Sequence, residues 1–556
     1  MMKGARILVE ALKKEGVDTL FCYNGGAVIS IFDELYSHGK EINLIQPRHE
    51  QGGTHAADGY ARSTGKPGVV LVTSGPGATN TITGIATAYM DSVPLVVFTG
   101  QVSTGMIGTD AFQEADTVGI TMPITKANFL VKNVEELAST VKKAFHLATT
   151  GRPGPVVVDI PKDVQMDETE FLYPLTPDLP GYRPKDSGHP RQVKILKKYL
   201  REARKPVVIS GGGVNSAGAT ELMNEFCDRY AVPVVTTLLG HGVSPQHEEL
   251  NYGPIGMHGS LYGNYALQNC DLLMAFGTRF SDRIMGDPDV FAEQARIVHV
   301  DIDAAEIGKN VSVDLPIVGP ITGVLEELNR EESYGDYSEW VEELRTYRDE
   351  NPLEFEQTEV LKPQYLIQLA QKYFPENTIV ASDVGQNQMW VAQYFHFHRG
   401  RRLLTSGGLG TMGYGLPAAI GAAVGNPDAQ VLTVSGDGGF QMNMQEMATV
   451  KQYGLKVKIL VLDNSCLGMV RQWQQLLFDK RYSGTCMNDN PDFGLMAKAM
   501  GIPSMKLEKV SEAEQTMKAF AESEGSMLLH AVIEGEENVV PMVPAGKPLD
   551  QVIRKM

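Results

Sequence analysis

The chain has 556 residues, of which 43% are hydrophobic and 21% charged, and its formal net charge is −18. This length exceeds what one hydrophobic core supports and predicts three or four domains of ordinary globular composition. The excess of negative charge argues against nucleic acid and anionic membrane surfaces as partners, because both are polyanions.

The first segment, residues 1–14, predicts an amphipathic helix and contains no signal-peptide core. No uncharged apolar run reaches the about 18 residues that a membrane-spanning helix needs. The cysteines form no CxxC pair, so neither a disulfide framework nor a zinc site is indicated, and we expect a reducing, cytoplasmic location. They are Cys22, Cys227, Cys270, Cys466 and Cys486.

Short β-rich runs alternate with helix-period segments along the chain, as at 68–73, 94–98 and 156–160. This alternation predicts an α/β protein made of doubly wound parallel sheets. Two polar stretches interrupt the pattern and are interpreted as linkers. The predicted organisation is a first domain 1–165, a linker 166–190, a middle domain 191–330, a linker 331–361, a third domain 362–535 and a tail 536–556.

In the first domain, Glu50 stands between a predicted strand end and a helix that opens with small residues. Such a carboxylate can sit deep in a site without filling it, although its commoner role is to interact with the helix macrodipole. A turn of small residues, 73–80, follows the next predicted strand.

In the middle domain, the predicted strand 206–210 runs into three glycines, Gly211 to Gly213, and then into a helix. The backbone N–H groups of such a turn can bind a phosphate at the helix start. Alone the signal is weak, because three consecutive glycines are not a GxGxxG fingerprint.

The third domain carries the most informative motif, Gly436-Asp437-Gly438, at the end of a predicted strand. A helix-length segment follows, and the next strand delivers Asn464 after 464 − 437 = 27 residues, about one crossover unit. A carboxylate and an amide oxygen are hard ligands that suit Mg²⁺ held against a diphosphate. For the Gly-Asp-Gly triplet alone, a turn with a surface Asp is the simpler alternative. A fainter strand–turn–helix–strand unit begins at Ser74 and suggests that the outer domains share a fold.

The Asp437 and Asn464 pattern resembles the thiamine diphosphate-binding motif. With Glu50 and residues 73–80 included, essentially the whole chain is similar to the catalytic subunits of the acetohydroxyacid synthase (acetolactate synthase) family. The three domains would then be pyrimidine-binding, central flavin-binding and Rossmann-like, and diphosphate-binding, in that order.

The resemblance implies a transferase that decarboxylates pyruvate on thiamine diphosphate and condenses the two-carbon unit with a second 2-oxoacid. Pyruvate would give 2-acetolactate and 2-oxobutyrate would give 2-aceto-2-hydroxybutyrate, which are precursors in isoleucine and valine biosynthesis. Glu50 would hydrogen-bond the pyrimidine ring and support general acid–base catalysis through the cofactor. The implied cofactors are thiamine diphosphate, Mg²⁺ and FAD, the flavin having no net redox role.

The resemblance also assigns cofactor residues. Asn387 stands where the family commonly has histidine, and we expect its amide to donate to phosphate. Met412 corresponds to the bulky residue that bends the cofactor, although core packing is its alternative role. The expected metal ligands are Asp437, Asn464 and the backbone oxygen of Cys466. The expected thiamine diphosphate contacts are Glu50, Pro76, Asn80, Val384, Gly385, Gln386, Asn387, Met412, Gly436, Asp437, Gly438, Gly439, Met442, Asn464, Leu467, Gly468 and Met469.

Substrate-side residues follow from the same comparison. Trp473 lies in a polar context of Gln and Arg and would favour 2-oxobutyrate as second substrate, with structural burial as the alternative. Lys126 matches a lysine near the active-site entrance, although an exposed lysine usually has no such role. Asn24 replaces a usual proline beside Gly26. The expected catalytic residues are Glu50, Gly26, Gln113 and Lys126, and the expected substrate contacts are Ala27, Phe112, Val470 and Trp473.

The middle domain resembles the flavin-binding domain of the anabolic synthases, with two departures. Ser281 replaces a usual Asp, and Pro320 follows Gly319 where Gly-Asp is common. The expected flavin contacts are Arg152, Gly211, Gly212, Gly213, Thr237, Leu238, Met257, His258, Gly277, Arg279, Arg283, Asp301 and Ile302.

The resemblance implies at least a homodimer, or a homotetramer, with the cofactor between the first domain of one chain and the third of another. A small regulatory subunit is compatible with the family. Two enzyme alternatives stay open: a flavin-independent catabolic acetolactate synthase, and a related thiamine-dependent decarboxylase or carboligase. A catalytically silent scaffold paralogue is the alternative of another class.

Overall fold

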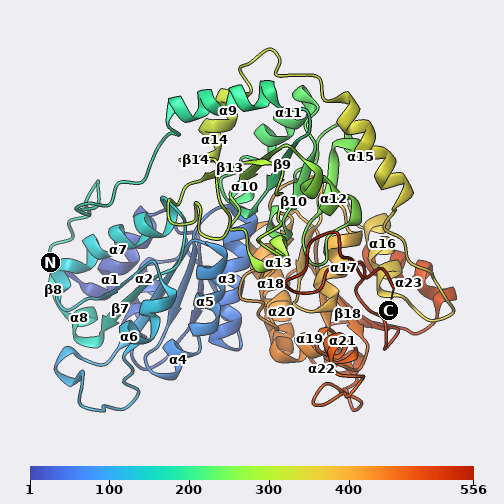
Figure 1. The fold of residues 1–556 in the computed structure, drawn as a ribbon. Coiled ribbons are helices and arrows are strands. Elements are labelled where there is room, and N and C mark those ends of the chain that lie inside the picture. Colours follow the sequence, from blue (N-terminus) through green and yellow to red (C-terminus); the bar gives the residue numbers. More distant parts are fainter. Residues whose placement is uncertain (556) are drawn as a thin grey trace.

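The computed structural model describes residues 1–555 and contains three parallel six-stranded sheets, each flanked by helices. Figure 1 shows the first and third sheets side by side, with the middle one above them. Within the described residues, none of the helices combines the length and the apolar character that crossing a membrane requires. The predicted α/β class is confirmed.

The first sheet has the strand order β3-β2-β4-β5-β7-β6. Alternate residues of β4 and β5 enter two different hydrophobic clusters, one on each face, as expected for a sheet covered on both sides. The short strands β1 (Met2–Lys3) and β8 (Glu168–Thr169) pair separately and antiparallel. The strands of the sheet are β2 (Thr19–Tyr23), β3 (Asn43–Ile45), β4 (Gly68–Val72), β5 (Leu95–Gln101), β6 (Ala127–Leu130) and β7 (Val156–Pro161). The helices are α1 (Gly4–Lys14), α2 (Ile29–His38), α3 (Glu50–Thr64), α4 (Pro76–Thr79), α5 (Ile82–Asp91), α6 (Thr117–Thr121), α7 (Val134–Thr149) and α8 (Lys162–Met166).

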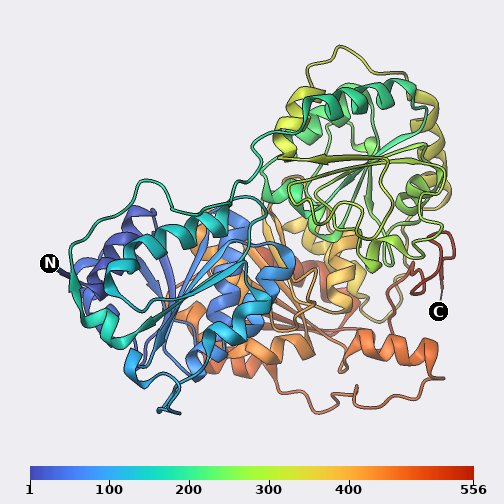
Figure 2. The ribbon, with the colours of Figure 1, turned by 60° about the vertical axis from the view of Figure 1, so that its left-hand side comes forward.

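The middle sheet has the order β11-β10-β9-β12-β13-β14 and also lies between two hydrophobic clusters. Its strands are β9 (Pro206–Ser210), β10 (Val234–Thr236), β11 (Asn251–Pro254), β12 (Leu272–Phe276), β13 (Arg296–Asp301) and β14 (Leu315–Val318). The helices are α9 (Pro190–Glu202), α10 (Gly212–Ser216), α11 (Thr220–Tyr230), α12 (Leu261–Asn269), α13 (Asp282–Met285), α14 (Ile321–Leu328) and α15 (Ser338–Glu350). Figure 2 shows this domain set apart from the other two.

The third sheet has the order β16-β15-β17-β18-β20-β19. Numbered within each domain, this is the order of the first sheet, so the turns after β4 and β17 occupy equivalent places. The strands are β15 (Ile379–Ser382), β16 (Leu403–Leu404), β17 (Val431–Gly436), β18 (Val457–Asp463), β19 (Ser504–Leu507) and β20 (Met527–Val532). The helices are α16 (Pro363–Tyr373), α17 (Gln386–Tyr394), α18 (Gly415–Gly425), α19 (Asp437–Asn443), α20 (Met447–Gln452), α21 (Gly468–Leu477), α22 (Phe493–Ala499) and α23 (Val510–Glu522).

The two outer domains share one hydrophobic core where α3 packs against α18, in the centre of Figure 1. Small residues allow this contact: a Cβ on Gly421 would lie 1.7 Å from the backbone oxygen of Ala56. A buried ion pair within α3 lies in the same region, where Arg62 donates to Asp58 at 2.6 Å, and Tyr414 of the third domain donates to the same carboxylate at 2.6 Å. The first and third domains are therefore tightly coupled within one chain.

Two segments differ from the expected organisation. The stretch 331–361, interpreted as a linker, contains α15, whose Trp340 and Leu344 are buried in a middle-domain cluster. The helix is mostly charged, so its few apolar residues gave little periodicity. The tail beyond 535 returns to the middle domain, where Val543 donates its N–H to the carbonyl of Met257 at 2.8 Å.

Candidate active site

The two expected side-chain metal ligands lie at the carboxyl edge of the third sheet. Asp437 begins α19 directly after β17, and Asn464 directly follows β18. These strands are neighbours, and their last paired residues, Gly436 and Leu462, are in register. Asp437 is therefore level with Asp463, and Asn464 follows one residue later, so the two expected ligands leave the same sheet edge although 27 residues separate them.

The surroundings of Asp437 are acidic and buried. Its side chain is almost fully buried, and burial, with repulsion from Asp463, raises the pKa of Asp437 to about 6. Asn490 donates to Asp437 Oδ2 at 2.7 Å and to Asp463 Oδ1 at 3.1 Å. Gln441 donates to the Asn490 amide oxygen at 3.0 Å and fixes its orientation. Two buried carboxylates joined by one amide form a set of oxygens that a divalent cation would stabilise.

Glycines make the adjoining loops approach closely. A Cβ on Gly438 would lie 2.7 Å from Leu467 Cδ2 and 3.5 Å from Met412 Cε, and a Cβ on Gly468 would lie 2.0 Å from Gln386 Oε1. These contacts gather Met412, Gly438, Leu467 and Gly468 into one cradle. Met412 is half-buried and belongs to none of the hydrophobic clusters, so the core-packing alternative is not supported.

The N-terminus of α17 lies beside this cradle, but its side chains are already paired. Asn387 donates to the carbonyls of Asp383 at 2.8 Å and Val434 at 3.2 Å, so its N–H groups do not have the free orientation that donation to phosphate requires. Gln386 donates to Gln472 Oε1 and to the carbonyl of Glu537, both at 2.9 Å. Gln386 thereby ties the site to α21 and the C-terminal tail.

The first domain contributes Glu50 at the first residue of α3. Asn80 donates to Glu50 Oε2 at 2.9 Å, and Glu50 Oε1 would lie 3.6 Å from a Cβ on Gly77. His49, not Glu50, caps the helix, because its ring nitrogen accepts from the N–H of Gln51 at 3.1 Å. The structure thus brings Glu50, Asn80 and the Pro76 turn together and assigns the capping role to another residue.

The loops expected to face substrate also meet here. A Cβ on Gly75 would lie 3.0 Å from Cα of Gln113, which places the Gln113 loop against the Pro76 turn. Ala27 donates its N–H to Thr73 Oγ1 at 3.1 Å, and no atom lies within 4 Å of a Cβ built on Gly26. Phe112 is 89% exposed in the single chain, which leaves it free to contact a ligand or a second protomer.

On the third domain, α21 carries Val470 and Trp473. Val470 is exposed and Trp473 is half-buried, outside the buried clusters. Asn24 uses its side-chain oxygen to accept from the N–H of Gly25 at 2.8 Å, which restrains the turn where proline is usual.

Lys126 lies elsewhere. Its ammonium donates to the carbonyls of Thr150 and Arg152 and to the hydroxyl of Tyr182, at 2.5 to 2.9 Å. Since these contacts use all three N–H groups, the geometry favours a structural role at the linker over one at the active-site entrance.

The expected flavin residues gather at the carboxyl edge of the middle sheet. Gly211 to Gly213 follow β9 and Gly277 follows β12, its neighbour; a Cβ on Gly211 would lie 2.1 Å from the oxygen of Gly277. Met257 pairs with Arg283, and Arg152 reaches from the first domain to Asp303 at 3.1 Å. The remaining members of the set lie on neighbouring loops: Thr237 and Leu238 after β10, His258, Arg279 after β12, and Asp301 and Ile302 at the end of β13.

Buried polar atoms without partners lie in the same loops. His258 Nδ1 and Thr278 Oγ1 make no hydrogen bond within the described chain. Burial lowers the pKa of His258 to about 4, so its imidazole is neutral at pH 7. Gly319 packs closely on the linker, because a Cβ built on it would lie 2.7 Å from the backbone nitrogen of Gly188. Orphaned donors and acceptors fit a polar ligand at this edge, whereas Pro320 offers no side-chain donor or acceptor there.

Two residues that support the site, Glu446 and Asn490, were not found by the sequence analysis. Glu446 accepts from the backbone N–H groups of Arg48 and His49, at 2.9 to 3.0 Å, and so supports the start of α3 from the third domain. Asn490 connects the two carboxylates described above. No local pattern indicates either role, since 398 positions separate Glu446 from Arg48 and 53 separate Asn490 from Asp437.

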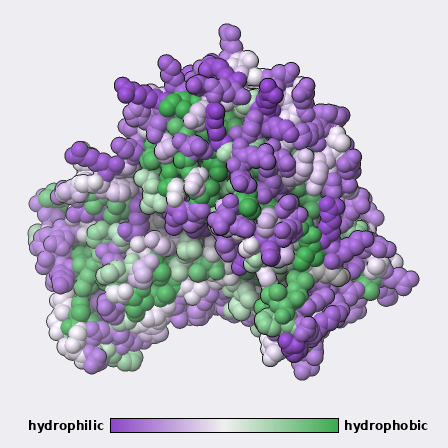
Figure 3. Space-filling model, in the orientation of Figure 1, coloured by the Kyte–Doolittle hydropathy of each residue, from purple (hydrophilic) through white to green (hydrophobic). Residues whose placement is uncertain are grey.

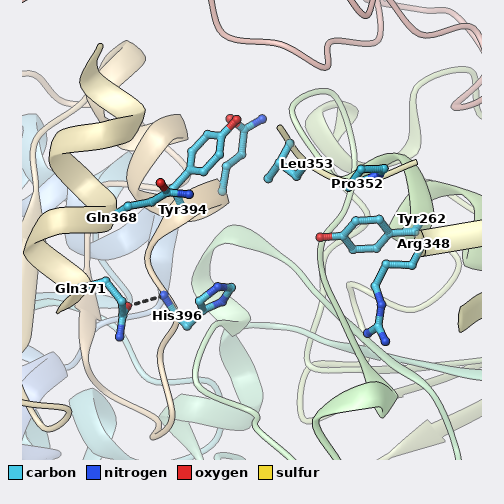
Figure 4. Close-up of a pocket in the computed structure, with 9 residues that line it drawn as sticks. Tyr262, Arg348, Pro352, Leu353, Gln368, Gln371, Tyr394 and His396 are labelled. Carbon is cyan, nitrogen blue, oxygen red and sulfur yellow. Dashed lines mark hydrogen bonds between the residues drawn. The ribbon is translucent and has the colours of Figure 1, made fainter. Parts of the chain in front are cut away.

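A cavity of about 270 Å³ lies at the other end of α17, away from the cradle. Figure 4 shows Tyr394 and His396 on one side of it and Tyr262 and Arg348 of the middle domain on the other. Gln371 accepts from the N–H of His396 at 2.8 Å there. None of the expected site residues lines it.

Three protein-family models match the chain. They describe the N-terminal TPP binding domain, the central domain and the C-terminal TPP binding domain of thiamine pyrophosphate enzymes, over residues 2–120, 193–328 and 383–531. A probable acetolactate synthase large subunit of Methanocaldococcus jannaschii is 45% identical and covers 100% of this chain and 95% of that protein. The acetolactate synthase large subunits of Lactococcus lactis and Corynebacterium glutamicum are 44% and 46% identical, over 99% and 98% of this chain and 96% and 89% of those proteins.

Proposed function

The chain belongs to the thiamine pyrophosphate-dependent acetolactate synthase family, and on that premise we propose that it joins pyruvate to a second 2-oxoacid, pyruvate or 2-oxobutyrate. The observation that carries the proposal is the pair Asp437 and Asn464 at one edge of the third sheet, and the Glu50 cluster of the first domain supports it. When bound, thiamine diphosphate supplies an electron sink for the carbon that loses CO₂.

We propose that Asp437, Asn464 and the backbone oxygen of Cys466 hold Mg²⁺ against the diphosphate. The donor set supports this, because carboxylate, amide and carbonyl oxygens are the hard ligands that Mg²⁺ prefers. The cation would neutralise the buried charge of Asp437, whereas Asp463 is already paired with His530 at 2.8 Å. The cradle glycines allow the loops around these ligands to approach one another closely. Its other proposed contacts are Pro76, Asn80, Val384, Gly385, Gln386, Met412, Gly436, Gly438, Gly439, Met442, Leu467, Gly468 and Met469.

Glu50 is the proposed proton-transfer residue. Asn80 holds Oε2, so the carboxylate orientation is fixed while Oε1 serves as the proton-carrying atom. The neighbouring loops carry Gly26 and Gln113, which are further proposed catalytic residues, and Ala27 and Phe112, which are proposed substrate contacts. Val470 and Trp473 on α21 are the proposed contacts for the second 2-oxoacid.

A flavin at the middle sheet is also proposed. The close glycine turn of Gly211 and Gly277, the unpaired polar atoms and the guanidinium of Arg152 support it. Flavin absorbance of the purified protein tests it: Arg152→Ala should lower the bound flavin, and a colourless wild-type protein after incubation with FAD would contradict it.

We propose a homodimer as the minimal active unit, with a small regulatory subunit as a further partner. Figure 3 shows apolar surface on the two lower lobes of the molecule and a hollow between them. Phe112, Met442 and Val470 are among the exposed apolar residues. Each belongs to the proposed site, which favours completion of the site by a second protomer.

Product analysis tests the proposed function. The protein is incubated with pyruvate, 2-oxobutyrate, thiamine diphosphate, Mg²⁺ and FAD. The expected products are 2-acetolactate and 2-aceto-2-hydroxybutyrate. Acetaldehyde without either product would favour a decarboxylase, and cofactor binding without turnover of any 2-oxoacid would favour a silent paralogue.

A further inference from the structure

Two cysteines face each other beside the proposed metal loop. Cys466 and Cys486 form an isolated antiparallel bridge. It is flanked by hydrogen bonds from Leu467 N–H to the oxygen of Thr485 at 2.9 Å and from Met487 N–H to the oxygen of Ser465 at 2.8 Å. This pattern makes Cys466 and Cys486 a non-hydrogen-bonded pair, the class in which Cα atoms lie closest, about 4.5 Å apart, with side chains on one face.

Such a separation falls within the range of about 4.4–6.8 Å that disulfides span. We propose that Cys466 and Cys486 are a redox modification site that a peroxide-class oxidant converts reversibly into a disulfide. Cys486 is exposed, and Cys466, its partner in the bridge, is 8% exposed. The other cysteines are buried in the first and middle domains, so this pair alone has both a partner and access to solvent.

The chemistry balances with hydrogen peroxide as the oxidant. The thiolate of Cys486 attacks one peroxide oxygen, the O–O bond breaks, and hydroxide leaves, which gives a sulfenic acid. The sulfur of Cys466 then attacks that sulfur: an S–S bond forms, the S–O bond breaks, and water leaves with the Cys466 proton. Two thiols lose two electrons in total, and the peroxide is reduced to two waters. A dithiol reductant reverses the step by thiol–disulfide exchange.

The bond would close a loop of 486 − 466 = 20 positions that contains all of α21. Only Arg471 and Gln472 of this helix are fully buried, and both are held by polar contacts to the tail, such as Gln472 with Val539. Leu477 and Phe478 at its end are exposed. A segment with few buried apolar contacts opens readily, so the disulfide would lock α21 on the loop that carries Asn464.

The test uses the full-length wild-type protein, treated with hydrogen peroxide and then denatured. Titratable thiols should fall from five to three, and peptide mapping should find Cys466 joined to Cys486. Backbone amides of residues 468–482 should exchange at least about tenfold more slowly after oxidation, because the closed loop restricts opening. A dithiol reductant should restore both readings. Cys486→Ser should keep its four thiols and show no slowing, whereas Cys270→Ser should fall from four thiols to two and show the same slowing as the wild type.

Retention of five thiols, overoxidation of Cys486 with Cys466 still free, or a disulfide between chains would overturn the proposal. An intact Cys466–Cys486 bond with unchanged amide exchange in α21 would overturn the inference that the disulfide locks this helix. These readings need no turnover, so they are independent of the proposed function.

Discussion

Replacing Glu50 by Gln tests the proton-transfer role most directly. Gln has the same shape, and its amide oxygen can still accept from Asn80, whose contact is 2.9 Å in the wild type. The substitution therefore keeps the geometry and removes the charge. We expect turnover of pyruvate to fall by about 10²–10⁴-fold, the usual share of general acid–base catalysis.

Stability should change little. Glu50 loses only its interaction with the α3 macrodipole, worth about 0.3–1 kcal/mol, because His49 supplies the cap. The matched control is Glu135→Gln, which makes the same change in the exposed first turn of α7. It should lose the same small amount of stability and no turnover.

The assay is acetolactate formation at saturating pyruvate, thiamine diphosphate and Mg²⁺, with bound cofactor measured separately. Turnover of Glu50→Gln within about threefold of the wild type, with cofactor bound, would refute the assigned role, since a step that needs Glu50 as acid or base must slow by more.

Three further predictions concern specificity, metal binding and pH. Trp473→Leu should keep 2-acetolactate formation and lower the share of 2-aceto-2-hydroxybutyrate in a two-substrate competition; an unchanged product ratio would remove Trp473 from the specificity site. Asn490→Ala removes the donor shared by Asp437 and Asp463, at 2.7 and 3.1 Å. Losing a hydrogen bond to a charged group costs about 1.5–3 kcal/mol, so Mg²⁺-dependent cofactor affinity in equilibrium dialysis should weaken by about tenfold or more, and equal affinity would show that Asn490 does not position the ligand. Burial lowers the pKa of His55 to about 3 and that of His241 to about 4. In the unfolded chain these imidazoles bind protons at their ordinary pKa of about 6.5. Their contribution to the free energy of unfolding is therefore fully present above that pH and is lost as the pH falls below it. Tm should therefore drop between pH 7 and pH 5, with proton uptake on unfolding, and a constant Tm would contradict the neutral burial of these rings.

The alternation of β-rich runs and helical segments predicted the α/β class, and the resemblance carried by Asp437, Asn464 and Glu50 predicted the family; both are confirmed. Parallel strands buried on both faces have apolar runs that stand out locally, and the 27-residue spacing reflects one crossover unit. The interpretation of 331–361 as a linker was partly wrong, because the segment contains α15. This helix is mostly charged and buries few residues, so its sequence shows little apolar periodicity.

Such patterns could not predict the hydrogen-bond partners of individual side chains. Lys126 was expected at the active-site entrance, yet three oxygens around the linker take its N–H groups. Asn387 was expected to donate to phosphate, yet Asp383 and Val434 accept its N–H groups. Hydrogen-bond partners depend on positions distant in the chain, which no local window contains.

Local patterns in the sequence were enough to identify the residue types at the strand ends and the chemistry class that they indicate: a carboxylate and an amide one crossover apart, and a glutamate before a small-residue helix. The contacts that hold these groups became visible in the folded chain. Asn490 joins two carboxylates, Glu446 supports the start of α3, and two cysteines meet across one bridge. The physical reason is that periodicity and spacing report short-range backbone geometry, whereas these contacts arise when separate sheets and loops pack together.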